Sequence, residues 1–235
     1  MTRSPLPAGI FVTGTDTEVG KTVVAAGLVS ALRARGLRVQ GMKPVASGCV
    51  RTEHGLRNDD AVSLSAASTA RREYDLVNPF AYEPAIAPHL AAARSGRPIR
   101  LETMELAYRE LGVGTDLIVV EGAGGWRVPL DERHTMADIA ARLSLPVVLV
   151  VGIRLGCINH ALLTAEAVVA DGRRLLGWVA NRIADDPLAA EQIDTLRGRL
   201  GAPLLGIVPR LSHVDAAQVA DYLDVTPVIP GESDL

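Results

Sequence analysis

Residues 20–22, Gly-Lys-Thr, place a flexible turn, a cation and a hydroxyl in one short loop. An apolar run at 10–12 precedes the loop, and an alanine-rich stretch without proline follows it to residue 32, which predicts the order strand, loop, helix. The first N–H groups of such a helix lack partners within it and point toward phosphate oxygens. Lys21 adds charge near the outer phosphates, and the Thr22 hydroxyl suits Mg²⁺. We predict a P-loop for a nucleoside triphosphate. The alternative is an ordinary glycine-rich turn, because Gly14 lies one residue upstream of the usual first glycine.

Two acidic residues are candidates for the same metal ion. Glu121 follows the apolar run LIVV, and an acid at the end of a buried strand near a P-loop is suited to hold Mg²⁺ or its waters. Asp60 could complete a metal site with Thr22 and Glu121. The alternatives are a carboxylate that caps the next turn for Glu121, and a helix start at Asn58-Asp59-Asp60 for Asp60.

Lys43 precedes Pro44 at the end of a second predicted strand, 37–45. A lysine at such a strand end is ordinarily solvated. The strand is nevertheless expected beside the one that feeds the P-loop. Lys43 and Lys21 facing one phosphoryl group would spread charge over a phosphoryl-transfer transition state, which makes both candidate catalytic residues.

Asn181 ends the apolar run GWVAN, where a nucleotide base would be recognised. It is followed by Arg182, and Asp185 stands one place too late for the Asn-Lys-x-Asp pattern of guanine-binding proteins, which favours adenine. The alternative is an asparagine that starts a loop.

Residues 157–159, Cys-Ile-Asn, begin a predicted helix after Gly156, so free N–H groups there could hold an anion. The sequence places no base beside Cys157, so packing is its expected role rather than nucleophilic attack. Cys49 and Cys157 lie far apart without a metal-binding spacing, which fits a reducing cytosol and a cytoplasmic protein.

These residues need a scaffold that brings strand ends together. Apolar runs at 116–122, 145–152, 174–181 and 202–209 alternate with helical patterns at 101–111, 135–143, 158–170 and 186–200. This alternation predicts an α/β fold: a doubly wound, mainly parallel sheet flanked by helices, of the P-loop NTPase type. Ligands bind beyond the carboxyl ends of the strands in such sheets, so one composite site is expected there.

Composition limits the classes of partner. A length of 235 residues suits a single domain, 1–235, and a net charge of −3 without a basic stripe argues against nucleic acid. No run of eighteen apolar residues and no signal-peptide core are present, so we expect no membrane segment.

Ordered motifs along most of the chain resemble the dethiobiotin synthetase family. They are GTDTEVGKT (14–22), MKPVASG (42–48), GLRNDDA (55–61), VEGAGGW (120–126), LGCINHALLTAE (155–166), GWVAN (177–181) and APLLGIVP (202–209). The resemblance implies an ATP- and Mg²⁺-dependent ligase of biotin biosynthesis that converts 7,8-diaminononanoate and CO₂ to dethiobiotin. One amine becomes a carbamate whose oxygen attacks the γ-phosphate of ATP. The second amine then attacks the carbonyl carbon of the mixed carbamic-phosphoric anhydride and displaces phosphate, which closes the ureido ring.

The resemblance also implies roles for the matching residues. Lys43 is catalytic, and Thr22, Asp60 and Glu121 bind the metal. The matching nucleotide-binding residues are Glu18, Val19, Gly20, Lys21, Thr22, Val23, Asp60, Glu121, Gly122, Ala123, Gly124, Asn181, Arg182, Pro209, Arg210 and Leu211. The matching substrate-binding residues are Thr13, Ser47, Cys157, Ile158 and Asn159, the last three on a helix from the second subunit of a homodimer with shared sites.

Two other functions fit a P-loop. A glutamine-dependent amidotransferase of the same class needs a separate glutamine-hydrolysing domain, for which no length remains. A P-loop switch or partitioning ATPase acting on a protein partner is the alternative from a different class.

Overall fold

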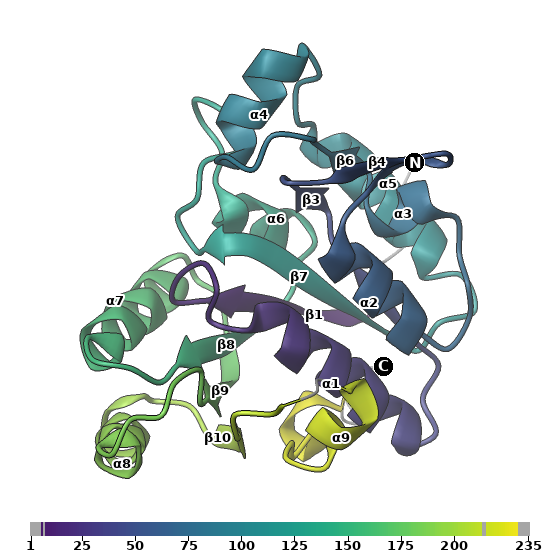
Figure 1. The fold of residues 1–235 in the computed structure, drawn as a ribbon. Coiled ribbons are helices and arrows are strands. Elements are labelled where there is room, and N and C mark those ends of the chain that lie inside the picture. Colours follow the sequence, from purple (N-terminus) through teal and green to yellow (C-terminus); the bar gives the residue numbers. More distant parts are fainter. Residues whose placement is uncertain (1–5, 7, 213–214, 230–235) are drawn as a thin grey trace.

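A computed structural model describes residue 6, residues 8–212 and residues 215–229. In this part of the chain six strands form one parallel sheet, in the order β10-β9-β8-β1-β7-β2 (Figure 1). The strands are β1 (Gly9–Gly14), β2 (Val39–Met42), β7 (Leu117–Gly125), β8 (Val147–Gly152), β9 (Leu175–Asn181) and β10 (Leu204–Val208). The predicted parallel sheet is confirmed.

Helices cover both faces of this sheet, as the doubly wound prediction requires. One face carries α1 (Lys21–Ala34), α2 (Asp59–Ala67), α9 (Ala216–Ala220) and the 3-10 turn η1 (Thr226–Val228). The other carries α5 (Leu101–Leu111), α6 (Met136–Arg142), α7 (Cys157–Ala170) and α8 (Ala189–Arg199). No helix among the described residues is long and apolar enough to cross a membrane.

Strand β8 shows why the apolar runs form a two-sided core. Val148 and Val150 pack into the cluster that contains α1, whereas Leu149 and Val151 pack against α7 and α8. Successive side chains of a strand point to opposite faces, so a strand buried on both faces must be apolar throughout. Each fully buried valine or leucine contributes about 1.5–3 kcal/mol relative to an exposed one. This run therefore determines a central strand.

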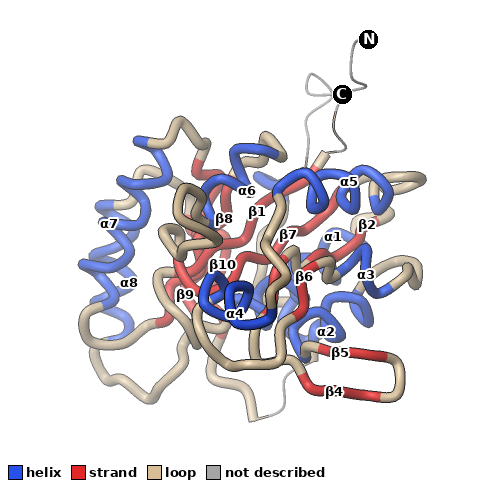
Figure 2. The backbone as a smooth tube through the Cα atoms, turned by 90° about the horizontal axis from the view of Figure 1, so that it is seen from above, coloured by secondary structure: helices blue, strands red, loops and turns tan. Residues whose placement is uncertain are grey.

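The segment between β2 and α5 holds several short elements besides α2. It contains β3 (Val45–Ala46), β4 (Val50–Thr52), β5 (Gly55–Arg57), α3 (Tyr74–Val77), β6 (Phe80–Ala81) and α4 (Pro88–Ser95). Strands β3 and β6 pair in parallel, while β4 and β5 form a hairpin that projects from the body (Figure 2). Strands of two or three residues are too short for a periodic pattern to reveal them.

The strand register brings the polar residues to one edge of the sheet. Val12 of β1 pairs with Glu121 of β7, and Gly152 of β8 pairs with Asn181 of β9. Glu121 does not end its strand as predicted, because β7 continues through a shifted pairing to Gly125. The carboxylate therefore emerges from the strand interior, where the surrounding backbone holds it rigidly.

Candidate active site

The loop between β1 and α1 has the geometry of a phosphate cradle. Gly20 is the N-cap of α1 with φ of 85°, a left-handed conformation that favours glycine. A Cβ there would also collide with the side-chain amide of Asn181. No side chain caps α1, so the amides of its first turn remain available to an anion.

Lys21, at the start of α1, is buried and reaches back over the loop. Its Nζ donates to the carbonyl oxygen of Asp16 at 2.7 Å. Burial and the neighbouring charge of Lys43 lower the pKa of Lys21 from 10.5 to about 8, against the attraction of nearby carboxylates. The site thus holds a cation that an anionic ligand would stabilise.

Lys43 follows β2 and is only 3% exposed, so the expectation of a solvated strand-end lysine is wrong. Its Nζ lies 2.6 Å from Oε1 of Glu121, 2.8 Å from Oδ2 of Asp60 and 3.2 Å from the carbonyl oxygen of Gly122. Burial alone would lower the pKa of Lys43, but the charges of the two acids outweigh burial and raise it. Lys43 therefore carries its charge.

One ammonium is thus shared by two carboxylates. Burial, together with the charge of Asp60, raises the pKa of Glu121 despite the contact with Lys43. Burial acts on Asp60 in the same direction, but Lys43 and Thr22 outweigh it and lower the pKa of Asp60. The site can accommodate a further cation close to Glu121.

The donor set fits a hard divalent cation. Oγ1 of Thr22 donates to Oε1 of Glu121 at 2.8 Å, and Oε2 of Glu121 is buried without a hydrogen-bond partner among the described residues. A hydroxyl and two carboxylates are ligands that Mg²⁺ accepts together with phosphate oxygens. The side chain of Asn58, not that of Asp60, caps α2 through a 3.3 Å bond from the Ala61 amide. The carboxylate of Asp60 is therefore directed to the site.

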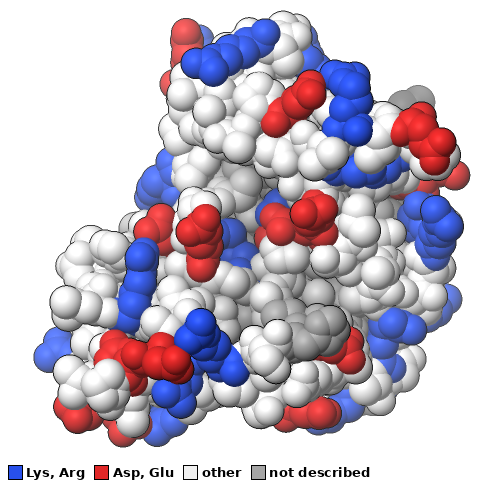
Figure 3. Space-filling view, viewed as in Figure 1, with Lys and Arg blue, Asp and Glu red and all other residues white. Residues whose placement is uncertain are grey.

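These side chains line one cleft of about 780 Å³. Figure 3 shows a hollow on this face, with acidic side chains beside it and basic atoms within it. The predicted residues that line the cleft are Glu18, Gly20, Lys21, Thr22, Val23, Lys43, Ser47, Asp60, Glu121, Ala123 and Gly124. Sequence reasoning missed the opposite wall, Ala85 to Pro88, which carries no chemical motif. The only signal in the sequence was Pro88 in this wall and Pro84 directly before it.

Comparison with known proteins identifies the family. A family model described as "AAA domain" matches residues 8–218. The ATP-dependent dethiobiotin synthetase BioD of Cellvibrio japonicus is 54% identical over 220 residues, covering 93% of this chain and 96% of that protein. The synthetase of the same name from Pseudomonas aeruginosa strain UCBPP-PA14 is 54% identical over 227 residues, covering 95% and 98%. The chain belongs to the ATP-dependent dethiobiotin synthetase family. It is an ATP-dependent ligase of biotin biosynthesis.

Solved structures similar to this chain support the fold alone. The MinC:MinD cell division protein complex of Aquifex aeolicus aligns with a TM-score of 0.58 at 19% identity, covering 93% of this chain and 87% of that one. The MinD cell division protein of the same organism aligns with a TM-score of 0.55 at 17% identity, covering 97% and 93%. The sequence identity to the synthetases, not the similarity to these structures, decides between the ligase and the alternative ATPase functions.

Several of the predicted site residues lie outside the cleft. Thr13 is buried inside β1, and Nδ2 of Asn181 donates to the carbonyl oxygen of Val19 at 2.9 Å, which ties the end of β9 to the phosphate loop. The amide of Arg182 donates to the carbonyl oxygen of Val208 at 2.9 Å. Pro209, Arg210 and Leu211 follow β10 on the same edge of the sheet. Asn181 and its neighbours thus form a separate group beside the loop.

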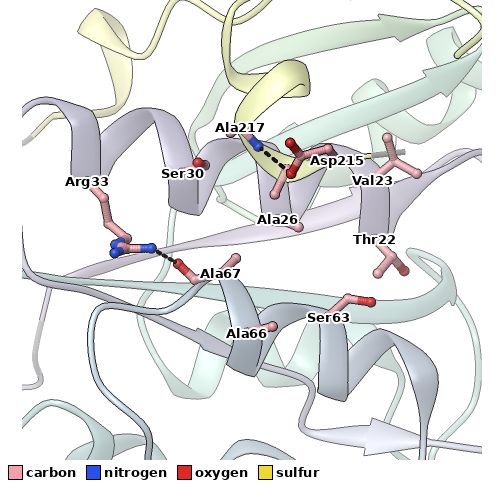
Figure 4. A pocket seen from close by; sticks show the side chains of 11 residues that line it. Thr22, Val23, Ala26, Ser30, Arg33, Ser63, Ala66, Ala67, Asp215 and Ala217 are labelled. Atoms are coloured by element: carbon pink, nitrogen blue, oxygen red, sulfur yellow. Dashed lines mark hydrogen bonds between the residues drawn. The ribbon is translucent and has the colours of Figure 1, made fainter. Parts of the chain in front are cut away.

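A second hollow, of about 480 Å³, runs along α1 from Thr22 and Val23 (Figure 4). Helix α2 forms one wall, and the start of α9 forms the other, with Asp215 as its N-cap. The nucleotide-binding residues predicted from the sequence end at Leu211 on this side. The only signal for Asp215 in the sequence is its position before an alanine-rich run, which is typical of a helix N-cap. Residues 213–214 lie outside the described part of the chain.

The predicted start of α7 at Cys157 is confirmed, but Cys157 is directed inward. Its Sγ lies 3.0 Å from Oε1 of Gln192, and its amide already donates to the carbonyl oxygen of Arg154 at 3.0 Å. Asn159 is exposed and Ile158 is half-buried. Neither lines the cleft of its own chain. An anion at this helix would therefore bind at Ile158 and Asn159 rather than at the thiol.

Proposed function

We propose that this single P-loop domain carboxylates 7,8-diaminononanoate with CO₂ and closes the ureido ring of dethiobiotin, using ATP and Mg²⁺. The observation that carries the proposal is the cluster at the end of the phosphate loop in which the buried Lys43 contacts the buried Glu121 and the partly exposed Asp60. The family supports ATP as the co-substrate and dethiobiotin as the product.

The protein contributes positioning and charge rather than a nucleophile. The amides at the start of α1 and the ammonium of Lys21 would hold the outer phosphates. Lys43 would face the transferring phosphoryl group, where developing negative charge is stabilised by a preorganised cation. The carbamate oxygen of the substrate would then attack the γ-phosphate and release ADP. The second amine would attack the carbonyl carbon of the resulting anhydride and displace phosphate. This chemistry fits a cleft whose functional groups are lysines, carboxylates and backbone amides.

Thr22, Asp60 and Glu121 would hold Mg²⁺ in this scheme. Their oxygen atoms converge at the phosphate loop, and the buried, unpartnered Oε2 of Glu121 supports a cation there. When bound, the ion would neutralise charge on the β- and γ-phosphate oxygens.

Adenine would be recognised at the group formed by Asn181, Arg182 and Pro209 to Leu211. Because Nδ2 of Asn181 is occupied by the carbonyl of Val19, Oδ1 remains to accept a hydrogen bond from the adenine amino group. The side chain of Arg210 is directed to Asp185, at 2.8 Å, so its contribution would come from the backbone.

The substrate carboxylate would bind at Ile158 and Asn159 of a second subunit, with Thr13 and Ser47 on the amine side. Large apolar side chains exposed just before and on α7 support such a homodimer: Leu155 is 93% exposed and Leu163, on the helix, is 56% exposed. Burying them against a second subunit would remove this apolar area from water.

The test is to incubate the protein with ATP, Mg²⁺, bicarbonate and 7,8-diaminononanoate and to measure phosphate release. We expect release that requires the diamine, together with dethiobiotin in the product by mass spectrometry. Phosphate release that is indifferent to the diamine and stimulated by a protein would overturn the proposal.

A further inference from the structure

The phosphate loop and the connection from β8 to α7 are joined by an ion pair on the surface of the cleft edge. Nη2 of Arg154 lies 2.9 Å from Oδ2 of Asp16. The two segments are neighbours in the fold because β1 and β8 pair side by side (Figure 1). The sequence separation of 138 residues means that only the tertiary structure brings this pair together.

Asp16 connects this ion pair to the phosphate-binding groups. Its other carboxylate oxygen accepts a 2.7 Å hydrogen bond from the amide of Thr17, and its carbonyl oxygen accepts from Nζ of Lys21 at 2.7 Å. Its position therefore sets both a loop amide and the location of the lysine charge. Glu18, two residues later, has φ of 60°, an uncommon conformation for a residue with a side chain. Such a backbone persists only where the surroundings hold it.

The other anchors of the loop lie on either side of Asp16. The amide of Thr15 donates to the carbonyl oxygen of Val150 at 3.2 Å, and the carbonyl of Val19 accepts from Asn181. Asp16 lies between these anchors and is bound by the side chain of Arg154, which comes from the connection between β8 and α7. The carbonyl oxygen of Arg154 also accepts the amide of Cys157, so the same residue fixes the first turn of α7.

We propose that Arg154 is a positioning residue for nucleotide binding: it holds Asp16, and through Asp16 it sets the phosphate loop and Lys21. The inference rests on the proposed role of this loop in ATP binding. Both side chains are about half exposed, at 46% and 48%. The attraction between their charges is therefore modest and is screened by salt.

The experiment measures the dissociation constant of a non-hydrolysable ATP analogue with Mg²⁺ by calorimetry, without diamine. Arg154→Met should weaken binding by about threefold to fivefold, the scale of an exposed ion pair. Arg154→Lys should recover most of the loss because it restores the charge. Arg197→Met is the matched control: Arg197 forms an exposed 2.9 Å pair with Asp194 on α8, and its loss should leave nucleotide affinity unchanged.

Asp16→Asn closes a double-mutant cycle, since the amide oxygen of asparagine can still accept from the Thr17 amide, while the charge and the acceptor oxygen for Arg154 are lost. After Asp16→Asn, Arg154→Met should have no further effect, and the ratio of variant to wild-type dissociation constants should approach one at about 1 M salt. Unchanged affinity in Arg154→Met, or strictly additive losses in the double variant, would overturn the role of Arg154. Diamine-independent phosphate release by the wild type would instead overturn the proposed reaction, because nucleotide affinity is measured without diamine.

Discussion

Replacing Lys21 by methionine should stabilise the nucleotide-free protein while it abolishes tight nucleotide binding. Methionine is of similar length and carries no charge, so it removes a buried cation without leaving a large cavity. The expectation follows from the pKa of Lys21, which burial and the charge of Lys43 lower from 10.5 to about 8.

The magnitude comes from this difference in pKa. At about 1.4 kcal/mol per pKa unit, a charged Lys21 at pH 7 costs roughly 3 kcal/mol of folding free energy. The lost hydrogen bond to the carbonyl of Asp16 offsets about 1 kcal/mol. A net gain of about 2 kcal/mol corresponds to a rise in Tm of roughly 4–8 °C for a chain of this size.

The pH dependence of unfolding tests separately whether Lys21→Met stabilises the protein. The pKa of Lys21 is lower in the folded than in the unfolded state, so the unfolded chain binds more protons between about pH 8 and 10.5. The cost of the charge is fully present below pH 8 and disappears as the pH rises toward 10.5. The advantage of Lys21→Met should therefore be large at pH 7 and small at pH 10.

The assay is urea unfolding without nucleotide at both pH values, with Lys43→Met as the contrasting variant. Because Glu121 and Asp60 raise the pKa of Lys43, its charge stabilises the fold, and its loss leaves Glu121 buried and unpaired. Breaking a buried pair in this way costs about 3–5 kcal/mol. The reasoning is refuted if Lys21→Met is as destabilising as Lys43→Met, or if its advantage persists undiminished at pH 10.

Three further predictions concern catalysis and ligand binding. Lys43→Gln should lower turnover by roughly 10²-fold or more, the scale of one preorganised donor; kcat must be measured on the folded fraction, and near-normal turnover would remove Lys43 from the mechanism. Thr22→Val and Asp60→Asn should each weaken Mg²⁺-nucleotide binding, measured by titration; if Asp60→Asn lowers only thermal stability, Asp60 serves the helix start alone. An analogue of the diamine with an amide in place of the carboxylate should bind more weakly than the acid, with ATP affinity unchanged, and Asn159→Ala should reduce this difference in affinity between acid and amide. An active monomer that processes acid and amide equally would contradict the shared site.

The sequence predicted the scaffold because a strand buried on both faces must be apolar along its whole length. The runs at 116–122, 145–152 and 174–181 are central or next-to-central strands, and helix 101–111 has the predicted bounds. The hairpin of β4 and β5 and the pairing of β3 with β6 escaped prediction. The hairpin strands have only three residues each, too few for a pattern, whereas β3 and β6 are held by contacts between distant segments, as in the bond from the amide of Tyr82 to the carbonyl of Ala46 at 2.9 Å.

For the site, the sequence determined which residue types stand at the strand ends. Only the tertiary structure decided how these residues are buried and which charges they contact. Gly20, Lys21 and Thr22 are local and follow from the loop itself. The burial of Lys43 is not local, because it depends on Asp60 and Glu121 arriving from α2 and β7. The link from Arg154 to Asp16 has the same origin, since it joins residues 138 positions apart through the pairing of β1 with β8. A pattern along the chain records neighbours in sequence, whereas burial, charge pairing and shifted pKa values arise between segments that only folding brings together.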